Sequence, residues 1–221
     1  MTNKKGLFIT FEGPDGSGKS TILSMVYDHL QSKNYSFVIN FTREPGGRNN
    51  IIAEDIRNIL LNKIEYKISP RAEALLFAAS RAQHVKDFIL PNLEKGHLIL
   101  CDRYIHSSLI YQGYARNLGI KEVWDINMFG INHVLPDLTI VLMLRPEEGL
   151  KRISMNELRE INRLDKEKLS LHQLVYNGYR KLIDENQNKN IVEVDASASV
   201  NEVFKKVIQI INNKIKEYYG E

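Results

Sequence analysis

A glycine-rich segment at residues 13–20 carries the residue types that bind phosphate. It reads Gly-Pro-Asp-Gly-Ser-Gly-Lys-Ser and fits the pattern G-x-x-x-x-G-K-[ST]. Glycines let the backbone approach phosphate oxygens, and successive N–H groups can then point at the anion. Lys19 is expected to reach the outer phosphates, and the Ser20 hydroxyl to bind Mg²⁺. The predicted contacts of a nucleoside triphosphate are Gly13, Pro14, Asp15, Gly16, Ser17, Gly18, Lys19, Ser20 and Thr21.

An acidic and a basic residue follow another apolar run. Asp102 and Arg103 come directly after residues 97–101. In an open parallel sheet, ligands bind at the carboxyl ends of the strands. Asp102 is therefore expected to face the same Mg²⁺, directly or through water, and Arg103 to meet phosphate charge. A surface ion pair between the two is the alternative.

Short apolar runs rich in β-branched residues alternate with segments of helical periodicity. Because these runs are nearly continuously apolar, both faces of their sheet should be covered. The alternation predicts an α/β fold with a five-stranded parallel sheet flanked by helices. Strands are expected at residues 7–11, 37–41, 97–101, 138–144 and 191–194, and helices at 19–32, 52–61, 70–94, 122–134, 146–154, 168–185 and 200–218.

The size and composition of the chain suit one domain. Its 221 residues can bury one sizeable core, so a single domain is expected over residues 1–221. With 30 basic and 27 acidic residues, the net charge of +3 is too small to indicate a nucleic-acid partner. A short polar N-terminus and the lack of a long apolar stretch predict no membrane partner and a cytoplasmic location. The lone Cys101 is expected to be a buried thiol.

Residues 155–168 form a highly charged, weakly apolar segment. Such a segment in isolation is usually a solvated helix face or loop. Because this one follows a strand and a helix in a phosphate-binding fold, we expect a short charged lid over about residues 152–168. Residues 162–165, Asn-Arg-Leu-Asp, lack the lysine of the guanine-binding pattern Asn-Lys-x-Asp and follow no strand, which argues against a GTPase.

Several short motifs stand between and within these elements. They are Phe-Glu-Gly-Pro-Asp-Gly-Ser-Gly-Lys-Ser (11–20), Thr-Arg-Glu-Pro-Gly-Gly (42–47), Leu-Phe-Ala-Ala-Ser-Arg (76–81), Asp-Arg-Tyr (102–104), Ser-Ser (107–108), Tyr-Gln-Gly (111–113), Pro-Asp-Leu-Thr (136–139) and Asn-Arg-Leu-Asp (162–165). In this order, over about residues 6–195, the chain resembles the bacterial thymidylate kinase family. The resemblance implies a P-loop nucleoside monophosphate kinase fold. It also implies transfer of the γ-phosphoryl of ATP, with Mg²⁺, to dTMP, giving dTDP, and a homodimer.

The resemblance also assigns residues to the acceptor dTMP. Phe77 matches the aromatic ring that stacks on thymine, and Arg81, one helical turn later, matches the arginine that hydrogen-bonds the base. Without the resemblance, Phe77 would be interpreted as core and Arg81 as surface. Tyr111 matches the tyrosine that excludes a ribose 2′-hydroxyl, and Asp15 the carboxylate near the sugar. The remaining acceptor positions are Arg43, Arg103, Ser107, Ser108 and Gln112.

Charge neutralisation is the main catalytic requirement of this reaction, because the acceptor phosphate is already ionised and needs no strong base. Lys19, Asp102 with its Mg²⁺, and Arg103 are expected to share that task. Some family members carry an arginine inside the phosphate loop, but residues 14–17 contain none. The missing charge is therefore expected from the lid. The candidates are Arg152, Arg159 and Arg163, with Arg159 first and Arg163 second. Arg152 is also expected to contact ATP.

Three positions depart from the family pattern, and three other functions stay open. His106 and Met143 stand where relatives often have acidic or amide residues, and Arg48 replaces a small residue. One is a P-loop kinase for dUMP or a deoxynucleoside. A nucleoside acceptor needs a general base for its hydroxyl, and Glu44 could serve as that base. A nucleotide-dependent switch or motor shares the phosphate loop but would need partner-binding features that the chain lacks. A weakened relative that only binds nucleotide is suggested by His106 and Met143.

Overall fold

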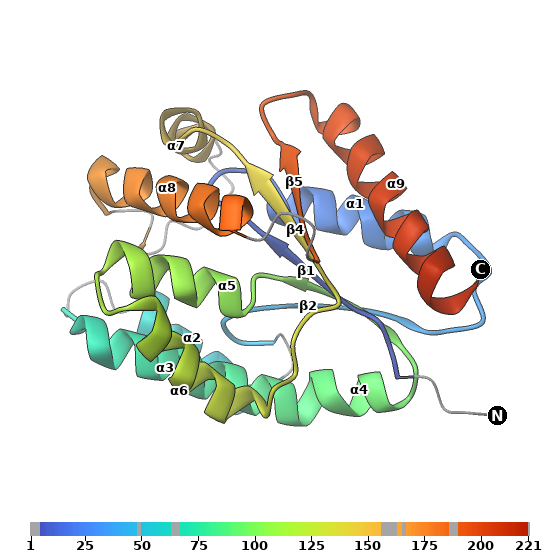
Figure 1. Ribbon diagram of the computed structural model, residues 1–221, viewed down its shortest axis with the longest axis horizontal. Helices are drawn as coiled ribbons and strands as arrows, with labels where there is room; N and C mark the ends of the chain where they lie inside the picture. Colours follow the sequence, from blue (N-terminus) through green and yellow to red (C-terminus); the bar gives the residue numbers. More distant parts are fainter. Residues whose placement is uncertain are drawn as a thin grey trace.

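A parallel sheet runs through the centre of the protein (Figure 1). The computed structural model describes residues 5–47, 50–62, 67–155, 163–164, 167–185 and 190–220. The sheet has five strands in the order β2-β3-β1-β4-β5, all parallel. They are β1 (Phe8–Glu12), β2 (Ile39–Arg43), β3 (Leu98–Asp102), β4 (Leu138–Met143) and β5 (Ile191–Asp195). The predicted five-stranded parallel sheet is confirmed, with boundaries shifted by at most two residues.

The strand order brings three chemically active strand ends together. β1 lies in the middle and pairs with β3 on one side and β4 on the other, so the chain reverses its direction of winding at β1. In register, Phe11 lies opposite Asp102, and Asp102 opposite Arg43. The carboxyl ends of β1, β3 and β2 are therefore neighbours. This edge is the switch point at which open α/β sheets bind ligands.

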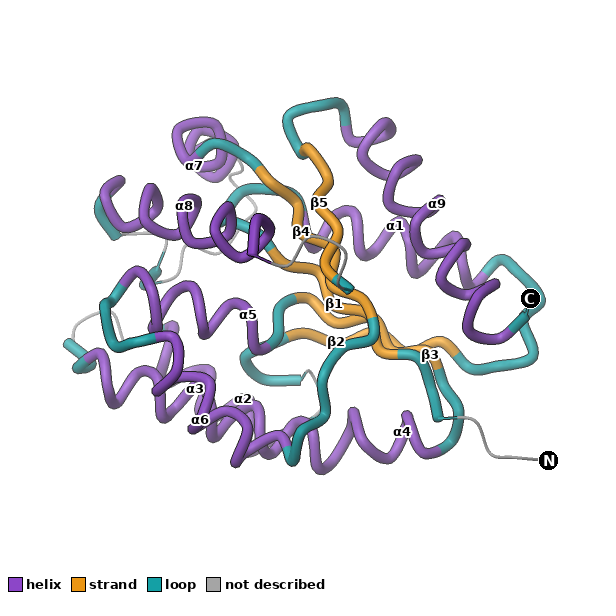
Figure 2. The backbone as a smooth tube through the Cα atoms, viewed as in Figure 1, coloured by secondary structure: helices purple, strands orange, loops and turns teal. Residues whose placement is uncertain are grey.

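Helices cover both faces of the sheet (Figure 2). α1 (Lys19–Gln31) and α9 (Val200–Tyr219) pack on one face, against side chains such as Ile9 and Phe11 of β1. Phe8 points to the opposite face, as expected from the two-residue repeat of a strand. The helices that follow β2, β3 and β4 are α2 (Ile51–Leu61), α3 (Pro70–His84), η1 (Val85–Ile89), α4 (Leu90–Glu94), α5 (Ile105–Ser108), η2 (Leu109–Ala115), α6 (Ile120–Ile131), α7 (Pro146–Ser154) and α8 (Leu169–Glu185).

The helices differ from the sequence prediction at two places. The single helix expected over residues 70–94 is α3, η1 and α4 in one run. It has a wider π-helical turn at Val85–Ile89, where Leu90 N donates to Val85 O. Pro91, next along, has no N–H to continue a regular ladder. The second place is residues 105–115, to which no element was assigned and which form α5 and η2. Among the described helices, none is long and apolar enough to span a bilayer.

Candidate active site

A cleft of about 930 Å³ opens at the carboxyl end of the sheet. It runs from the loop after β5, past the turn between β1 and α1, to α3 and η2. Most of the site residues predicted from the sequence line it, although they come from distant parts of the chain. These are Asp15, Gly16, Ser17, Gly18, Lys19, Ser20, Thr21, Arg43, Phe77, Arg81, Asp102, Arg103, Ser107, Ser108, Tyr111, Gln112 and Arg152.

The phosphate loop wraps around the ammonium group of Lys19. Lys19 Nζ donates to Gly13 O at 3.0 Å and Pro14 O at 2.8 Å, and it lies 3.3 Å from Ser17 Oγ. Burial of the side chain, together with the positive charge of Arg103, lowers the pKa of Lys19 to about 7, although nearby carboxylates counteract part of this shift. An anion bound beside Lys19 would restore its charge, so the loop is matched to phosphate.

The phosphate loop also packs directly on the backbone of α7. A Cβ atom on Gly16 would lie 2.2 Å from Gly149 O, and one on Gly149 would lie 2.4 Å from Asp15 O. Gly16 has a φ of +77°, in the region that favours glycine. The two glycines therefore let the loop and α7 touch backbone to backbone.

Two oxygen-bearing side chains meet beside the loop. Ser20, in the first turn of α1, donates its hydroxyl proton to Asp102 Oδ2 at 2.5 Å. A hydroxyl and a carboxylate are hard oxygen ligands, and Mg²⁺ typically takes only one or two protein ligands beside phosphates and water. Across the described residues, no group of three His, Cys, Asp or Glu side chains gathers to hold a metal. The pair thus fits a magnesium ion that arrives with a nucleotide.

Arg103 connects the phosphate loop to the opposite half of the cleft. Its Nη2 donates to Asp15 Oδ1 at 2.5 Å, and its Nη1 to Gly13 O at 3.2 Å and Ser107 Oγ at 3.0 Å. Tyr111 completes the group, because its hydroxyl donates to Asp15 Oδ2 at 2.7 Å. Burial alone would raise the pKa of Asp15, but the charges of Arg103 and Lys19 hold it below the usual value. Asp15 is therefore an anion at neutral pH.

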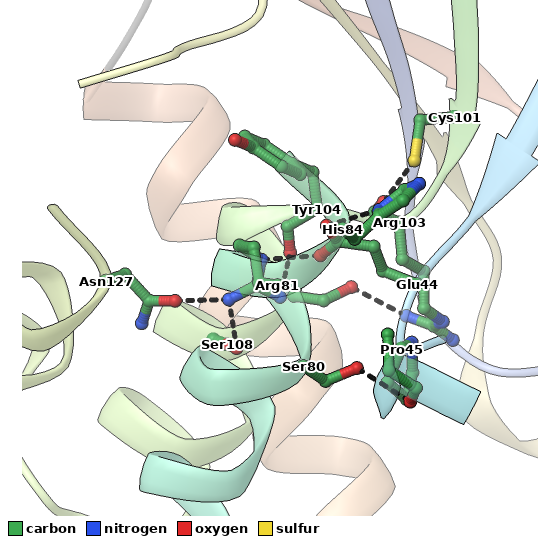
Figure 3. Close-up of polar contacts among 12 residues, drawn as sticks. Glu44, Pro45, Ser80, Arg81, His84, Cys101, Arg103, Tyr104, Ser108 and Asn127 are labelled. Carbon is green, nitrogen blue, oxygen red and sulfur yellow. Dashed lines mark hydrogen bonds and ion pairs between the residues drawn. The ribbon is translucent and has the colours of Figure 1, made fainter. Parts of the chain in front are cut away.

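Arg81 sits at the centre of a hydrogen-bond network at the far end of the cleft (Figure 3). Its Nε donates to Glu44 Oε2 at 2.5 Å, and its Nη2 to Tyr104 O at 3.1 Å. Its Nη1 donates to Asn127 Oδ1 and, at 3.1 Å, to Ser108 Oγ. Arg81 is 2% exposed, and these hydrogen bonds fix the orientation of its guanidinium group. The N–H groups of Arg81 can therefore donate to a ligand in the cleft in a defined direction.

An apolar wall lies beside Arg81. Phe77 stands one turn earlier on α3, and its ring is 8% exposed. Leu60 and Leu61 of α2 and Leu164 pack around it. A flat ring backed by aliphatic side chains can stack on a planar base.

Cations at the mouth of the cleft come from β2 and α2. Arg43 Nη1 donates to Pro45 O at 3.0 Å, and Arg43 Nη2 pairs with Glu54 at 3.0 Å. Arg57, on α2, also donates to Pro45 O at 3.0 Å and lines the cleft. Sequence reasoning found Arg43 and missed Arg57, which no motif marks.

The opposite end of the cleft is formed by α7 and the loop after β5. Arg152 Nη1 donates to Ala196 O at 3.0 Å, and its Nη2 to Glu148 Oε1 at 2.7 Å. The lining there continues over residues 196–200, which the sequence analysis did not include. The small Ala and Ser side chains of that segment carried no recognisable signal.

Of the two lid arginines placed first as catalytic candidates, the structure describes only Arg163. Arg159 lies outside the described residues. Arg163 Nε donates to Leu60 O at 2.9 Å, and its Nη2 to Glu73 Oε2 at 2.5 Å, so it is anchored to α2 and α3. Arg163 is not part of the cleft lining that includes the phosphate loop.

Two buried acids hold the site together: Glu12, which the sequence analysis did not select, and Glu44, which it considered only as a general base in a rival kinase. Glu12, at the end of β1, accepts hydrogen bonds from Tyr104 N at 2.8 Å, Ser107 Oγ at 2.6 Å and the Tyr179 hydroxyl at 2.8 Å. Glu44 accepts from Arg81 and pairs with His84 Nδ1 at 3.1 Å. The one available signal was position, since Glu12 directly follows the apolar Phe11 and Glu44 directly follows the last residue of β2.

Two of the three departures from the family pattern, His106 and Met143, lie outside the cleft lining. Met143 is 3% exposed and packs in an apolar cluster with Tyr111, Val175 and Tyr179. Burial lowers the pKa of His106, whose Nδ1 lies 3.5 Å from Thr139 Oγ1. Arg48 lies outside the described residues.

A parallel sheet with a phosphate loop after its first strand, in one cleft with an aromatic wall and a buried arginine, is the arrangement of a P-loop kinase. A model of the family described as thymidylate kinase matches residues 11–207. A thymidylate kinase of Bacillus licheniformis is 50% identical over 96% of this chain and 98% of its own length. One from Clostridium novyi is 49% identical over 92% of this chain and 97% of its own length.

Solved structures agree with these sequence comparisons. The crystal structure of thymidylate kinase from Ehrlichia chaffeensis matches with a TM-score of 0.72 and 27% identity, over 94% of this chain and 99% of that one. This chain belongs to the thymidylate kinase family, enzymes of nucleotide biosynthesis that use ATP and phosphorylate dTMP to dTDP. The family and the reaction predicted from the sequence are confirmed at this level.

Proposed function

We propose that this chain transfers the γ-phosphoryl of ATP, bound with Mg²⁺, to dTMP through the residues of the cleft described above. The observation that carries the proposal is the contact of Arg103 with Asp15, which lies in one cleft between the phosphate loop and the wall that contains Phe77 and Arg81. Two substrates bound on either side of that contact would have their reacting phosphates side by side. Positioning of this kind is the main requirement of phosphoryl transfer.

ATP occupies the half formed by residues 13–21 in this proposal. Lys19 holds the outer phosphates, and Ser20 and Asp102 bind the Mg²⁺ that neutralises them. The low pKa of Lys19 supports its role, because the lysine gains a full charge only when an anion lies beside it. Arg152 borders the nucleoside part of ATP, together with residues 196–200.

The acceptor dTMP occupies the other half. Phe77 stacks on the base, while Arg81, Ser108 and Gln112 contact its polar edge. Asp15 and Tyr111 border the sugar. The acceptor phosphate lies among cations and a hydroxyl, contributed by Arg43, Arg103 and Ser107.

Transition-state charge is shared by Lys19, Arg103 and the Mg²⁺ at Asp102. Arg159 remains the sequence-based candidate for one further charge, and Arg159→Ala should lower turnover about 100-fold or more. The anchored position of Arg163 favours a different role, argued below. Glu44 is 4% exposed and occupied by Arg81 and His84, which disfavours it as a general base for a nucleoside.

We also propose that two copies of the chain pair through the helices that cover the acceptor half. α2 packs on α3, and α3 on α6. These helices expose large apolar side chains: Ile52 (56%) and Ile59 (40%) on α2, Leu75 (57%) on α3 and Phe129 (93%) on α6. Light scattering after gel filtration should give twice the chain mass for the unaltered protein, and Phe129→Glu should shift it toward the monomer. An unaltered protein of single-chain mass contradicts this proposal.

The kinase proposal is tested by one coupled assay. Purified protein with ATP and Mg²⁺ is given dTMP, dUMP, dCMP, AMP and thymidine in parallel. We expect dTMP to be the best acceptor and thymidine to be inert. Equal rates with dCMP or AMP, or no reaction with dTMP, would overturn the assignment of the acceptor pocket.

A further inference from the structure

A buried carboxylate, Glu73, lies behind the acceptor pocket and receives three side chains. Glu73 is 0% exposed and stands one turn before Phe77 on α3. Gln112 Nε2 donates to its Oε1 at 2.9 Å, and Arg116 Nε to the same atom at 2.7 Å. Arg163 Nη2 donates to Oε2 at 2.5 Å. The Glu73 carboxylate thus accepts hydrogen bonds from one amide and two guanidinium groups.

The charge of Glu73 decides how these partners must orient. Burial alone would raise the pKa of its carboxyl, but the hydrogen bonds from Arg116 and Gln112 and the charge of Arg163 lower it below the usual value. At neutral pH, Glu73 is therefore an anion that only accepts hydrogen bonds. Gln112 can meet such an anion only with its NH₂ end.

The opposite end of the Gln112 amide is then a carbonyl oxygen on the cleft side. Gln112 lines the cleft. No residue in the described ranges donates a hydrogen bond to Gln112 Oε1. The atom is also not sealed off, because within these ranges only His172 Nε2 is a fully buried polar side-chain atom without a partner. Gln112 Oε1 is thus an acceptor that is available to a bound base.

Arg81 supplies the complementary group at the same pocket. Its Nη2 carries two hydrogens, and in the described structure Tyr104 O takes one of them. Arg81 also donates to Ser108 Oγ, one helical turn before Gln112. The pocket therefore presents a donor from Arg81 and an acceptor from Gln112. Thymine offers a carbonyl at position 4 and an N–H at position 3, whereas cytosine offers an amino group and a lone pair there.

We propose that Glu73 is a positioning residue that holds the Gln112 amide with its carbonyl toward the base, and so sets the preference for thymine over cytosine. The inference rests on the proposed placement of the base between Phe77, Arg81 and Gln112. Arg116 and Arg163 keep Glu73 ionised and fixed. This gives Arg163 a task at the acceptor pocket, where its contacts lie, in place of the catalytic charge for which the sequence made it the second candidate.

The direct test is Glu73→Gln, measured with dTMP and dCMP at saturating ATP. The new amide can itself donate, so the Gln112 amide becomes free to turn and to offer its NH₂ end to cytosine. The ratio of kcat/KM for dTMP to that for dCMP should fall at least about 10-fold, since a reversed hydrogen-bond pattern in a buried site is strongly discriminated. The change should arise in KM for the monophosphate, with KM for ATP unaltered. A ratio equal to that of the unaltered enzyme would overturn the proposal.

Glu193→Gln is the matched control for that substitution. Glu193 on β5 also accepts from an arginine, Arg180 Nη1 at 2.8 Å, but lies outside the cleft lining. The substitution Glu193→Gln changes the net charge by the same amount as Glu73→Gln. In Glu193→Gln, the ratio of kcat/KM for dTMP to that for dCMP should equal the ratio of the unaltered enzyme. A drop as large as that in Glu73→Gln would show that the loss of one negative charge causes it, whatever its position.

A swapped pair distinguishes amide orientation from a general structural role. In the double variant Glu73→Gln with Gln112→Glu, the amide at position 73 can donate to the carboxylate at position 112. The second carboxylate oxygen then faces the base as an acceptor, and the net charge beside Arg116 and Arg163 is kept. The preference for dTMP should return, in contrast to Gln112→Leu, which lacks any acceptor. A folded double variant as unselective as Gln112→Leu would overturn the proposal.

The same measurements separate this inference from the function on which it rests. If Glu73→Gln does not fold, judged by circular dichroism, the double variant against Gln112→Leu carries the test alone. If the unaltered enzyme shows no preference for dTMP, the placement of the base is wrong and the inference ends with it. If the unaltered enzyme prefers dTMP and Glu73→Gln keeps the full preference, only the role of Glu73 is wrong.

Discussion

Arg103 Nη2 lies 2.5 Å from Asp15 Oδ1, so the residue after β3 is paired with the centre of the phosphate loop. Arg103 takes up this position with a backbone φ of +68°, in the left-handed region that costs a non-glycine residue about 1–2 kcal/mol. Its own Nη1 is also held by Gly13 O and Ser107 Oγ. The strained backbone thus aims one guanidinium at the junction of the two substrate halves.

Two substitutions of Arg103 should distinguish the catalytic effect of its charge from the effect of its backbone conformation on stability. Arg103→Ala and Arg103→Gly both remove the charge, so kcat/KM for dTMP should fall about 100- to 1,000-fold in each. Glycine relieves the positive φ, whereas alanine does not. Urea unfolding should therefore find Arg103→Gly more stable than Arg103→Ala by about 1 kcal/mol. Equal free energies of unfolding would show that the backbone of Arg103 carries no strain.

Nucleotide binding should be coupled to proton uptake at Lys19. With a pKa of about 7, Lys19 is mostly neutral at pH 8.5 in the free enzyme. Phosphate charge favours the protonated form, so binding raises this pKa and the complex takes up about one proton at pH 8.5. The uptake should vanish as the pH falls well below 7, where Lys19 is already charged. Calorimetry of ATP binding in buffers of different ionisation enthalpy measures it.

Lys19→Arg is the control for this coupling, because a guanidinium stays charged throughout the range. Its binding of ATP should take up no proton at pH 8.5. Identical uptake in both proteins would assign the proton to another group.

Tyr179 should stabilise the site through Glu12. Its hydroxyl donates to Glu12 Oε2 at 2.8 Å and lies 3.1 Å from Ser107 Oγ, which in turn accepts from Arg103. Tyr179→Phe removes the hydrogen bond to the buried Glu12 carboxylate. The free energy of unfolding should therefore fall by about 1.5–3 kcal/mol. Turnover should also fall, since Ser107 loses part of its support. Urea unfolding and the coupled assay measure the two effects.

Tyr27→Phe provides the comparison for that variant. In the described part of the chain, the Tyr27 hydroxyl makes no hydrogen bond, so its removal should change the free energy of unfolding by less than about 0.5 kcal/mol. If the two variants are equally stable, the Glu12 network contributes little.

Cys101 should be unreactive in the folded enzyme. Its side chain is 0% exposed, and burial, reinforced by nearby carboxylates, raises the pKa of the thiol well above its usual value. The thiolate is the reactive form, so a thiol reagent should label Cys101 only when the protein unfolds. Mass spectrometry across a urea series should show labelling follow the unfolding curve. Fast labelling without urea would contradict the buried position.

The parts of the site that residue patterns alone predicted are those whose signal is local, whereas the acceptor residues such as Phe77 and Arg81 came from the family resemblance. The phosphate loop combines turn residues, the lysine and the hydroxyl within residues 13–20, and Asp102 follows directly on an apolar run. β1 and β4 were equally clear, because each is a short run, mostly apolar, that is buried on both faces. Such signals need no knowledge of distant partners.

The parts that sequence analysis missed depend on contacts between distant segments. Glu73 matters because Gln112 and Arg163 meet it, 39 and 90 residues away along the chain. Glu12 likewise depends on Tyr179, 167 residues later. A lone acid on a helix carries no mark of such partners, so only the fold distinguishes it from a solvated residue. The contacts of Arg163 with Leu60 and Glu73 were likewise invisible in the sequence, where Arg163 was only the second candidate for a catalytic charge.

The contact between Gly16 and Gly149 constrains how this chain can vary. A Cβ at either position would meet backbone atoms of the other segment, not the end of a flexible side chain. No side-chain change elsewhere can make room for it. In a saturation-mutagenesis selection, both positions should tolerate glycine alone, and neither should acquire second-site suppressors. Gly16 and Gly149 must therefore both be retained for α7 to pack on the phosphate loop. This requirement holds during evolution even if the acceptor pocket changes its substrate preference.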